Sequence, residues 1–125
     1  MAKSLVQQKS LASALHVIEV YRQLPSDREF VLSRQLLRSG TSIGANIESA
    51  LAAQSRKDFL SKMSVASKEA RETRHWLTLF DRSHLAAVEM ESSLKEVDEL
   101  IRMLTAIVKT TGERPPPTQS SEVKT

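Results

Sequence analysis

The sequence contains no cysteine, which excludes disulfide bonds, thiolate metal sites and thiol nucleophiles. It has three glycines and four prolines in 125 residues, and aromatic residues make up 4%. Few helix breakers therefore interrupt the chain, and the lack of aromatic and β-branched alternation leaves no stretch that predicts a strand. No apolar run approaches the roughly 18 residues needed to cross a bilayer, so no membrane span is predicted.

The residues that are present predict one globular domain. Apolar residues make up 40% and charged residues 26%, with a formal net charge of +3. This balance is typical of a chain that buries a core, and its mild basicity permits contact with nucleic acid without requiring it. Polar residues interrupt residues 1–9 too early for the core of a signal peptide. We therefore expect a cytoplasmic protein.

Apolar periodicity predicts a helix in each quarter of the chain before residue 112. The first is expected at about residues 4–23 and ends at Leu24–Pro25, since proline cannot extend the hydrogen-bond ladder. The second, at about 27–52, begins at Ser26 and Glu29, which have capping-box spacing. Their expected inward residues are Leu11, Ala14, Leu15, Ile18 and Tyr21 in the first, and Leu32, Leu36, Ser39, Ile43, Ile47 and Ala50 in the second.

The third and fourth helices have near-regular alternation of four- and three-residue steps. The third begins after Ser55, where Asp58 repeats the N-cap pattern, and the fourth is expected at about 86–111. Gly112 follows, where a left-handed helix stop is expected. Their expected inward residues are Phe59, Met63, Ala66, Ala70, Thr73, Leu77 and Phe80 in the third, and Met90, Leu94, Val97, Ile101, Leu104 and Val108 in the fourth.

Four helices with short connections predict an all-α, antiparallel up-down-up-down four-helix bundle. The bundle domain is expected to span residues 1–112. Residues 113–125 contain a proline triplet among polar residues, a composition that cannot bury enough apolar area to offset its ordering entropy. We expect this segment to be a flexible tail.

The helices carry more apolar surface than one core needs, which favours a homo-oligomer. The second helix adds a stripe at seven-residue spacing, and the fourth adds apolar residues beside its main seam. Gly40 and Gly44, four residues apart in a helix, indicate a close approach of another helix, either from a second copy or within the chain. The expected interface residues are Phe30, Leu37, Gly40, Gly44, Leu51, Leu100, Met103 and Ile107.

Four segments of the chain form a distinctive combination: Gln35–Ser39, Ser42–Ile47, Ser55–Phe59 and Lys68–Leu77. Together they resemble a four-helix-bundle family encoded by ribosomal-RNA intervening sequences, and the likeness covers about residues 10–110. The resemblance implies a ring of five subunits and little chemistry, since the family is mostly of unknown function. A related branch, the accessory variability determinant of diversity-generating retroelements, is a basic pentamer that binds a reverse transcriptase and nucleic acid.

Three polar residues are expected to be buried between helices. Asn46 falls on the seam of the second helix, where a buried amide must find hydrogen-bond partners. Glu69, Glu72 and Thr73 are the candidate partners across the helix interface. Such a bond would fix helix register, and ligand recognition is the alternative role.

Catalytic motifs are scarce. Glu72 and His75 form one Glu-x-x-His, which is half of a di-iron signature, but the second half is missing and His75 is expected to face solvent. No nucleophile elbow or phosphate-binding glycine loop is present. We therefore expect no catalytic residues, no metal, no cofactor and no small-molecule substrate, with a small enzyme or metal-binding bundle as the alternative.

The third helix is basic on its solvent side. Between residues 54 and 76 there are six positive and three negative residues. One solvent-facing stripe, called the basic stripe below, consists of Lys57, Lys68, Arg71, His75 and Arg82. It predicts contact with the RNA backbone, with Arg34 and Arg38 as secondary candidates, although a solvated face is the simpler interpretation. The expected partners are copies of the chain and an RNA or protein, without a membrane.

Overall fold

The computed structural model describes residues 4–25, 30–84 and 87–113. These residues form four α-helices: α1 (Leu5–Gln23), α2 (Phe30–Leu51), α3 (Arg56–Ser83) and α4 (Glu91–Glu113). The expected all-α class and the count of four helices in the described part of the chain are confirmed. The capping box expected at residues 26–29 and all but the first residue of the expected tail lie outside the described residues.

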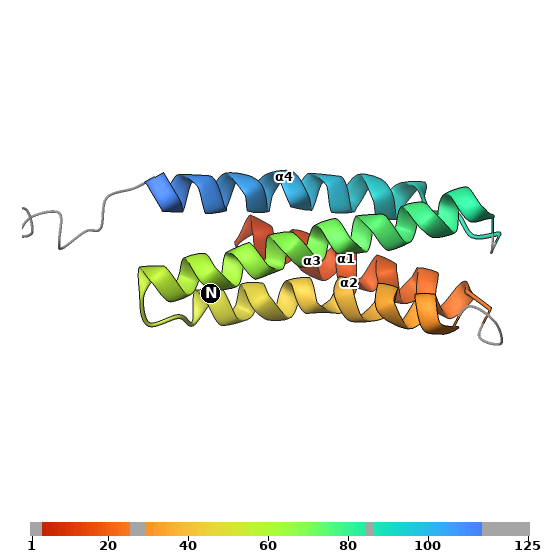
Figure 1. Ribbon diagram of the computed structural model, residues 1–125, viewed down its shortest axis with the longest axis horizontal. Coiled ribbons are helices and arrows are strands. Elements are labelled where there is room, and N and C mark those ends of the chain that lie inside the picture. Colours follow the sequence, from red (N-terminus) through yellow and green to blue (C-terminus); the bar gives the residue numbers. More distant parts are fainter. Residues whose placement is uncertain (1–3, 26–29, 85–86, 114–125) are drawn as a thin grey trace, which may run out of the picture.

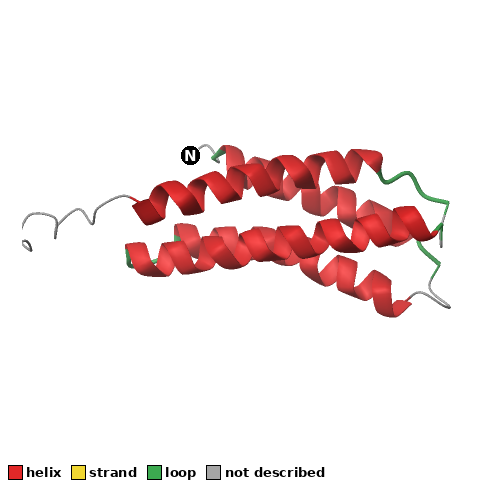
Figure 2. Ribbon diagram, turned by 45° about the horizontal axis from the view of Figure 1, so that its top comes forward, coloured by secondary structure: helices red, strands yellow, loops and turns green. Residues whose placement is uncertain are grey.

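The helices pack in chain order as an up-down bundle (Figure 1). Each helix contacts its sequence neighbours, and α1 also contacts α4, which closes the bundle. The four helices run roughly parallel or antiparallel to one another, as a view rotated by 45° also shows (Figure 2). The turn between α2 and α3 lies at the same end of the bundle as the C-terminal end of α4 (Figure 1).

Local capping explains several helix ends. Ser4 caps α1 in a capping box with Gln7, and Ser55 Oγ accepts a hydrogen bond from the Asp58 backbone N–H at the start of α3. The α3 cap was predicted from the sequence. His84 ends α3 in the left-handed conformation, with φ of 55°.

The predicted limits of α4 were wrong at both ends. Residues 87–90 are not helical, and α4 begins at Glu91, where Glu89 Oε2 accepts a hydrogen bond from the Ser92 backbone N–H at 3.1 Å. Gly112 is part of the helix, and no described glycine has positive φ. A glycine near a helix end permits a left-handed stop but does not force one.

The predicted inward faces of α2, α3 and α4 are confirmed. Leu36, Ile43, Ala66, Leu77 and Val97 are among residues with no exposed surface, and the partly buried Leu32, Phe59, Leu94 and Val108 pack against them. Such 4-3 spacing keeps one side of a helix against its neighbours over many turns.

The predicted inward face of α1 was wrong. Leu11, Leu15 and Ile18 are 50%, 57% and 36% exposed. The buried face is instead Val6, Ser10, Ser13, Val17 and Val20. Small residues on this face let α1 approach α2 closely: a Cβ added at Gly40 would lie 2.7 Å from Cγ1 of Val17. The close approach at Gly40 is therefore an intrachain contact.

Among the described residues, no helix is long and apolar enough to cross a membrane.

Candidate functional site

The basic stripe lies along the solvent side of α3. All five of its members are exposed: Lys57, Lys68, Arg71, His75 and Arg82. Within the described part of the chain, neither Lys57 nor Arg82 has an ion-pair partner. Arg71 donates to Thr105 Oγ1 of α4 at 3.0 Å, which places its guanidinium towards the α3–α4 junction. The stripe is thus a row of basic side chains on the solvent side of the helix.

Arg38 differs from the stripe because two carboxylates hold it. Its guanidinium donates to Glu69 Oε1 at 3.1 Å and to Glu72 Oε2. Trp76 Nε1 donates to the same Glu72 oxygen at 3.1 Å. The hydrogen bond from Arg38 is the main cause that lowers the pKa of Glu72, and the hydrogen bond from Trp76 adds to it. Arg38 therefore links α2 to α3 and is a poor candidate for phosphate contact. Arg34 is also exposed on α2.

The expected cross-helix bond of Asn46 was wrong. Its side chain is half-buried, and Nδ2 donates to the Ser42 carbonyl of the same helix at 2.9 Å. Residue 46 precedes the central seam residue Ile47, so its side chain lies about 100° around the helix from the core. Glu69 and Glu72 are partly buried at the α2–α3 interface as partners of Arg38.

The residues expected at an oligomer interface do not share one surface. Leu100 has no exposed surface and belongs to the core, so it cannot contact another copy. Its position on α4 is one residue before the seam residue Ile101, and the apolar face of α4 is wide enough to bury both. Met103 and Ile107 pack at the edge of the same core.

The remaining members of that set lie on α2. Gly40 is buried against α1, Leu37 and Gly44 are half-buried, and Leu51 is 47% exposed at the end of the helix. The side chain of Phe30 lies outside what the structure describes.

An exposed apolar row that was not expected from the sequence lies on α1. We call Leu11, Leu15 and Ile18 the α1 ridge. The sequence analysis identified these residues but placed them inside. A second α1 stripe with the same 4-3 spacing, at positions 6, 10, 13, 17, 20 and 24, was the signal for the true inward face.

A shallow groove of about 320 Å³ runs beside the ridge, between α1 and α2. We call it the α1–α2 groove; its lining is Gln7, Ser10, Leu11, Ala14, Thr41, Gly44 and Glu48. Gln7 Nε2 donates to Glu48 Oε2 at 3.0 Å and links the two helices at one end of the groove.

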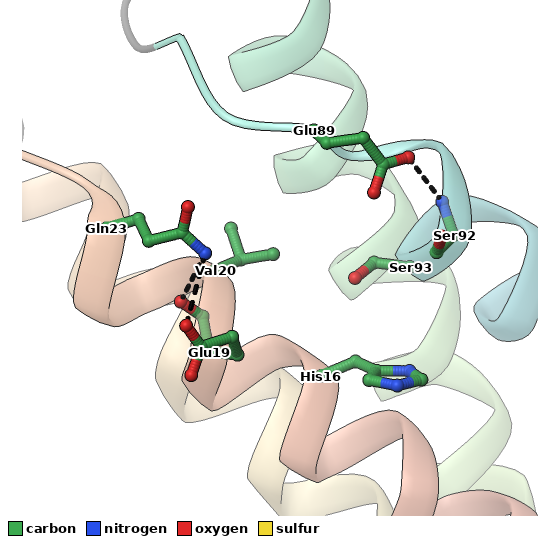
Figure 3. A pocket seen from close by; sticks show the side chains of 7 residues that line it. All are labelled: His16, Glu19, Val20, Gln23, Glu89, Ser92 and Ser93. Carbon is green, nitrogen blue, oxygen red and sulfur yellow. Dashed lines mark hydrogen bonds between the residues drawn. The ribbon is translucent and has the colours of Figure 1, made fainter.

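A second groove, of about 230 Å³, lies between α1 and the start of α4 (Figure 3). Several of its polar groups have partners within the protein: Gln23 Nε2 donates to Glu19, and Glu89 accepts from the Ser92 backbone N–H at the start of α4. His16 Nδ1 forms a contact with Glu96, which joins α1 to α4 beside the groove. Because these contacts hold α1 and α4 together, we interpret the groove as part of the packing between the two helices.

Glu72 and His75 do not converge on a common point. Glu72 contacts Arg38 and Trp76, whereas His75 is exposed on the basic stripe. Within residues 4–25, 30–84 and 87–113, no three side chains of the types that bind metals are grouped together.

Taken together, the described residues define a small four-helix bundle with an apolar ridge and groove on one side and a basic stripe on α3. The chain belongs to the 23S rRNA-intervening sequence protein family, whose model matches residues 2–106. This confirms the family resemblance drawn from the sequence motifs.

A solved structure gives the same fold. It is a protein of unknown function from the S23 ribosomal protein family of Bacteroides thetaiotaomicron, 44% identical to this chain, with a TM-score of 0.78. The match covers 84% of this chain and 99% of that one. No curated protein matches the chain.

Proposed function

We propose that this protein is a non-enzymatic scaffold that assembles with copies of itself into a ring and presents the basic stripe to RNA. The exposed α1 ridge carries the assembly part of the proposal. Each of its three side chains is at least 36% exposed, and all three are large and apolar. Contiguous apolar surface of this kind usually marks an interface, and a ring of five subunits is what the family resemblance implies.

Native mass spectrometry tests the assembly. The wild-type protein is expected to give a mass of several copies at micromolar concentration, and Leu15→Asp is expected to give a single-copy mass. Leu79→Asp is the matched control, since Leu79 is 39% exposed on α3, away from the ridge. It should leave the oligomer intact. A wild-type protein that is a single copy at that concentration contradicts the assembly.

The RNA part of the proposal depends on the open charges of the basic stripe. Lys57 and Arg82, near opposite ends of α3, have no ion-pair partner among the described residues. In a ring the stripe is repeated in every subunit, so many lysines and arginines face the same nucleic acid. Such contacts bind the sugar-phosphate backbone without reading its sequence.

Fluorescence anisotropy with a short labelled RNA tests this contact. Affinity is expected to fall steeply between low and moderate salt, because bound counterions are released. The double variant Lys57→Gln/Lys68→Gln should weaken binding and flatten the salt dependence. The control Lys95→Gln/Lys109→Gln removes the same charge from exposed positions on α4 and should change both less. Binding that is absent or independent of salt contradicts the RNA contact and leaves the assembly standing.

A further inference from the structure

The α1 ridge and the α1–α2 groove lie side by side on the same face of the bundle. The ridge projects from α1, with Leu11 and Leu15 half exposed. The groove beside it has small walls, since Ser10, Ala14 and Thr41 line it and Gly44 has no side chain. Among the described residues of other helices, the atom near the point where a Cβ of Gly44 would lie is Ser10 Oγ, at 3.6 Å.

The groove has room for aliphatic side chains. An apolar cavity of about 150 Å³ holds a benzene molecule, and this groove measures about 320 Å³. The ridge cannot fill the groove of its own chain, because side chains on a helix point away from its axis and α1 itself forms one wall. A side chain that fills the groove must therefore come from another molecule.

The last two ridge residues together with Arg22 have the same spacing as the α2 wall of the groove, while Leu11 itself lines the groove of its own chain. Leu15, Ile18 and Arg22 follow one another along α1 at steps of three and four. Thr41, Gly44 and Glu48 follow one another along α2 at the same steps. If α1 of one copy runs parallel to α2 of another, these equal steps let three successive pairs of residues face each other over two helical turns.

The two rows are also complementary in charge. Arg22 is exposed at the C-terminal end of the ridge row, and Glu48 is exposed at the end of the groove. A second copy thus offers an apolar row ending in a positive charge to a small-walled row ending in a negative charge. An RNA partner does not fit, because Glu48 is the charged side chain of the groove.

We propose that copies of this chain associate head to tail, with the α1 ridge of one copy in the α1–α2 groove of the next. Leu15 then packs on Thr41, Ile18 on Gly44, and Arg22 pairs with Glu48. Each copy uses different surfaces towards its two neighbours, so the contact is heterologous and repeats until a ring closes. This inference rests on the self-assembly proposed above and names the surfaces that carry it.

A mixing experiment with two variants tests the contact. Leu15→Lys disables the ridge and keeps the groove, whereas Thr41→Lys disables the groove and keeps the ridge. Both residues are exposed, so the single copy should keep its helix content and melting temperature. Each variant alone should be monomeric by native mass spectrometry. An equimolar mixture should give a one-to-one dimer, because one intact ridge meets one intact groove while the other contact places two lysines together.

The outcomes separate this contact from self-assembly in general. If the wild type assembles but the mixture stays monomeric, the ridge-and-groove contact is wrong and assembly through another surface remains. A wild type that stops at two copies also contradicts the head-to-tail contact, since it indicates an isologous pair. A wild-type monomer contradicts both proposals.

A charge exchange tests the register without placing any charge in an apolar site. Arg22→Glu and Glu48→Lys should each shift the assembly towards smaller species at low salt. The double variant should restore it, since the pair is present again with reversed signs. If the double variant does not regain the wild-type assembly, the pairing of Arg22 with Glu48 is wrong. This result does not depend on whether Leu15→Lys and Thr41→Lys fold.

Discussion

The hydroxyl of Thr73 on α3 donates to the hydroxyl of Ser39 on α2 across 3.0 Å, and neither residue has any exposed surface. Each hydroxyl also lies within hydrogen-bond distance of a carbonyl of its own helix, Glu69 at 2.8 Å for Thr73 and Leu36 at 3.3 Å for Ser39, so the single hydroxyl proton of Thr73 is shared between two acceptors. The pair therefore joins two helices inside the core without leaving either buried hydroxyl unpaired.

The Ser39–Thr73 pair should show strong coupling in a double-mutant cycle. Thr73→Val keeps the shape of the side chain and removes the hydroxyl, which should lower the free energy of unfolding by about 1 kcal/mol. In the Ser39→Ala/Thr73→Val variant both partners are absent, so the loss should be smaller than the sum of the two single losses. Urea denaturation of the four proteins measures this. Additive losses show that the hydroxyls do not interact.

The two glycines of α2 should respond oppositely to alanine. A Cβ at Gly40 would meet the short, stiff side chain of Val17 at 2.7 Å, so Gly40→Ala should lower the free energy of unfolding by about 1–3 kcal/mol through overpacking. At Gly44 the nearest atom of another helix in the same chain is at 3.6 Å, so Gly44→Ala should raise the free energy of unfolding of a single copy by about 0.5–1 kcal/mol through helix propensity. Thermal denaturation compares the two variants. Equal effects at both sites contradict the close α1–α2 approach at Gly40.

The Arg38–Glu72 pair should make stability depend on pH in acid. The hydrogen bond from Arg38 lowers the pKa of Glu72 from its ordinary 4.5, so the folded state favours the ionised carboxylate. This stabilisation is fully present above the ordinary pKa and is lost as the pH falls through the lowered folded pKa. Glu72→Gln should therefore lower the free energy of unfolding near neutral pH, by less than about 1 kcal/mol for so exposed a pair.

The difference between Glu72→Gln and wild type should vanish on acidification to about pH 2, where the carboxylate is protonated in both states. Glu113→Gln is the control, because Glu113 is exposed at the end of α4 and has no ion-pair partner among the described residues. Its effect should not vary with pH in this way. A Glu72→Gln effect that stays constant down to acid pH contradicts the charged interaction.

The two faces of α1 should differ in what they stabilise. Val17 is 1% exposed, so Val17→Ala should cost about 2 kcal/mol of unfolding free energy at every protein concentration. Leu15 is 57% exposed, so Leu15→Ala should change the stability of a single copy by less than about 0.5 kcal/mol. Its larger effect should appear only where copies associate, since assembly stabilises the folded chain by mass action. Circular-dichroism melting curves over a range of protein concentrations compare the variants.

Three of the four helix faces could be predicted from the sequence because each carries one dominant apolar stripe. On α3, the residues at 63, 66, 70, 73, 77 and 80 have no competing stripe of similar hydrophobicity, and all are buried. The N-cap of α3 was equally clear from Ser55. The basic stripe followed from the same assignment, since the side of a helix opposite its core must face solvent.

The face of α1 could not be predicted from hydrophobicity because its two stripes compete. The more apolar one, which contains Leu15, points outward, and the inward one contains Ser10 and Ser13. What decides the orientation is fit against α2: Val17 occupies the space that Gly40 leaves open. The interaction is between two positions 23 residues apart in the chain, so no local pattern contains it.

The Asn46 error has a similar origin. Asn46, a polar residue near the seam of α2, was expected to form a hydrogen bond to another helix. The bond between α2 and α3 is instead formed by Ser39 and Thr73 in the core. Hydroxyl groups are small enough to lie among apolar residues and still satisfy a backbone carbonyl, which an amide at the same place does less easily. The acidic pair at 69 and 72 was expected to be buried, but both side chains are only partly buried and pair with Arg38, which was assigned to RNA.

Trp76 is the only tryptophan of the chain, and its indole N–H bonds to the carboxylate that Arg38 also holds. When tryptophan is excited selectively, the fluorescence of the protein therefore comes from the junction of α2 and α3. Loss of that junction, whether by acid, by denaturant or by substitution of Arg38, exposes the indole to a more polar environment. The protein thus carries an intrinsic optical probe of one helix contact, which needs no added label.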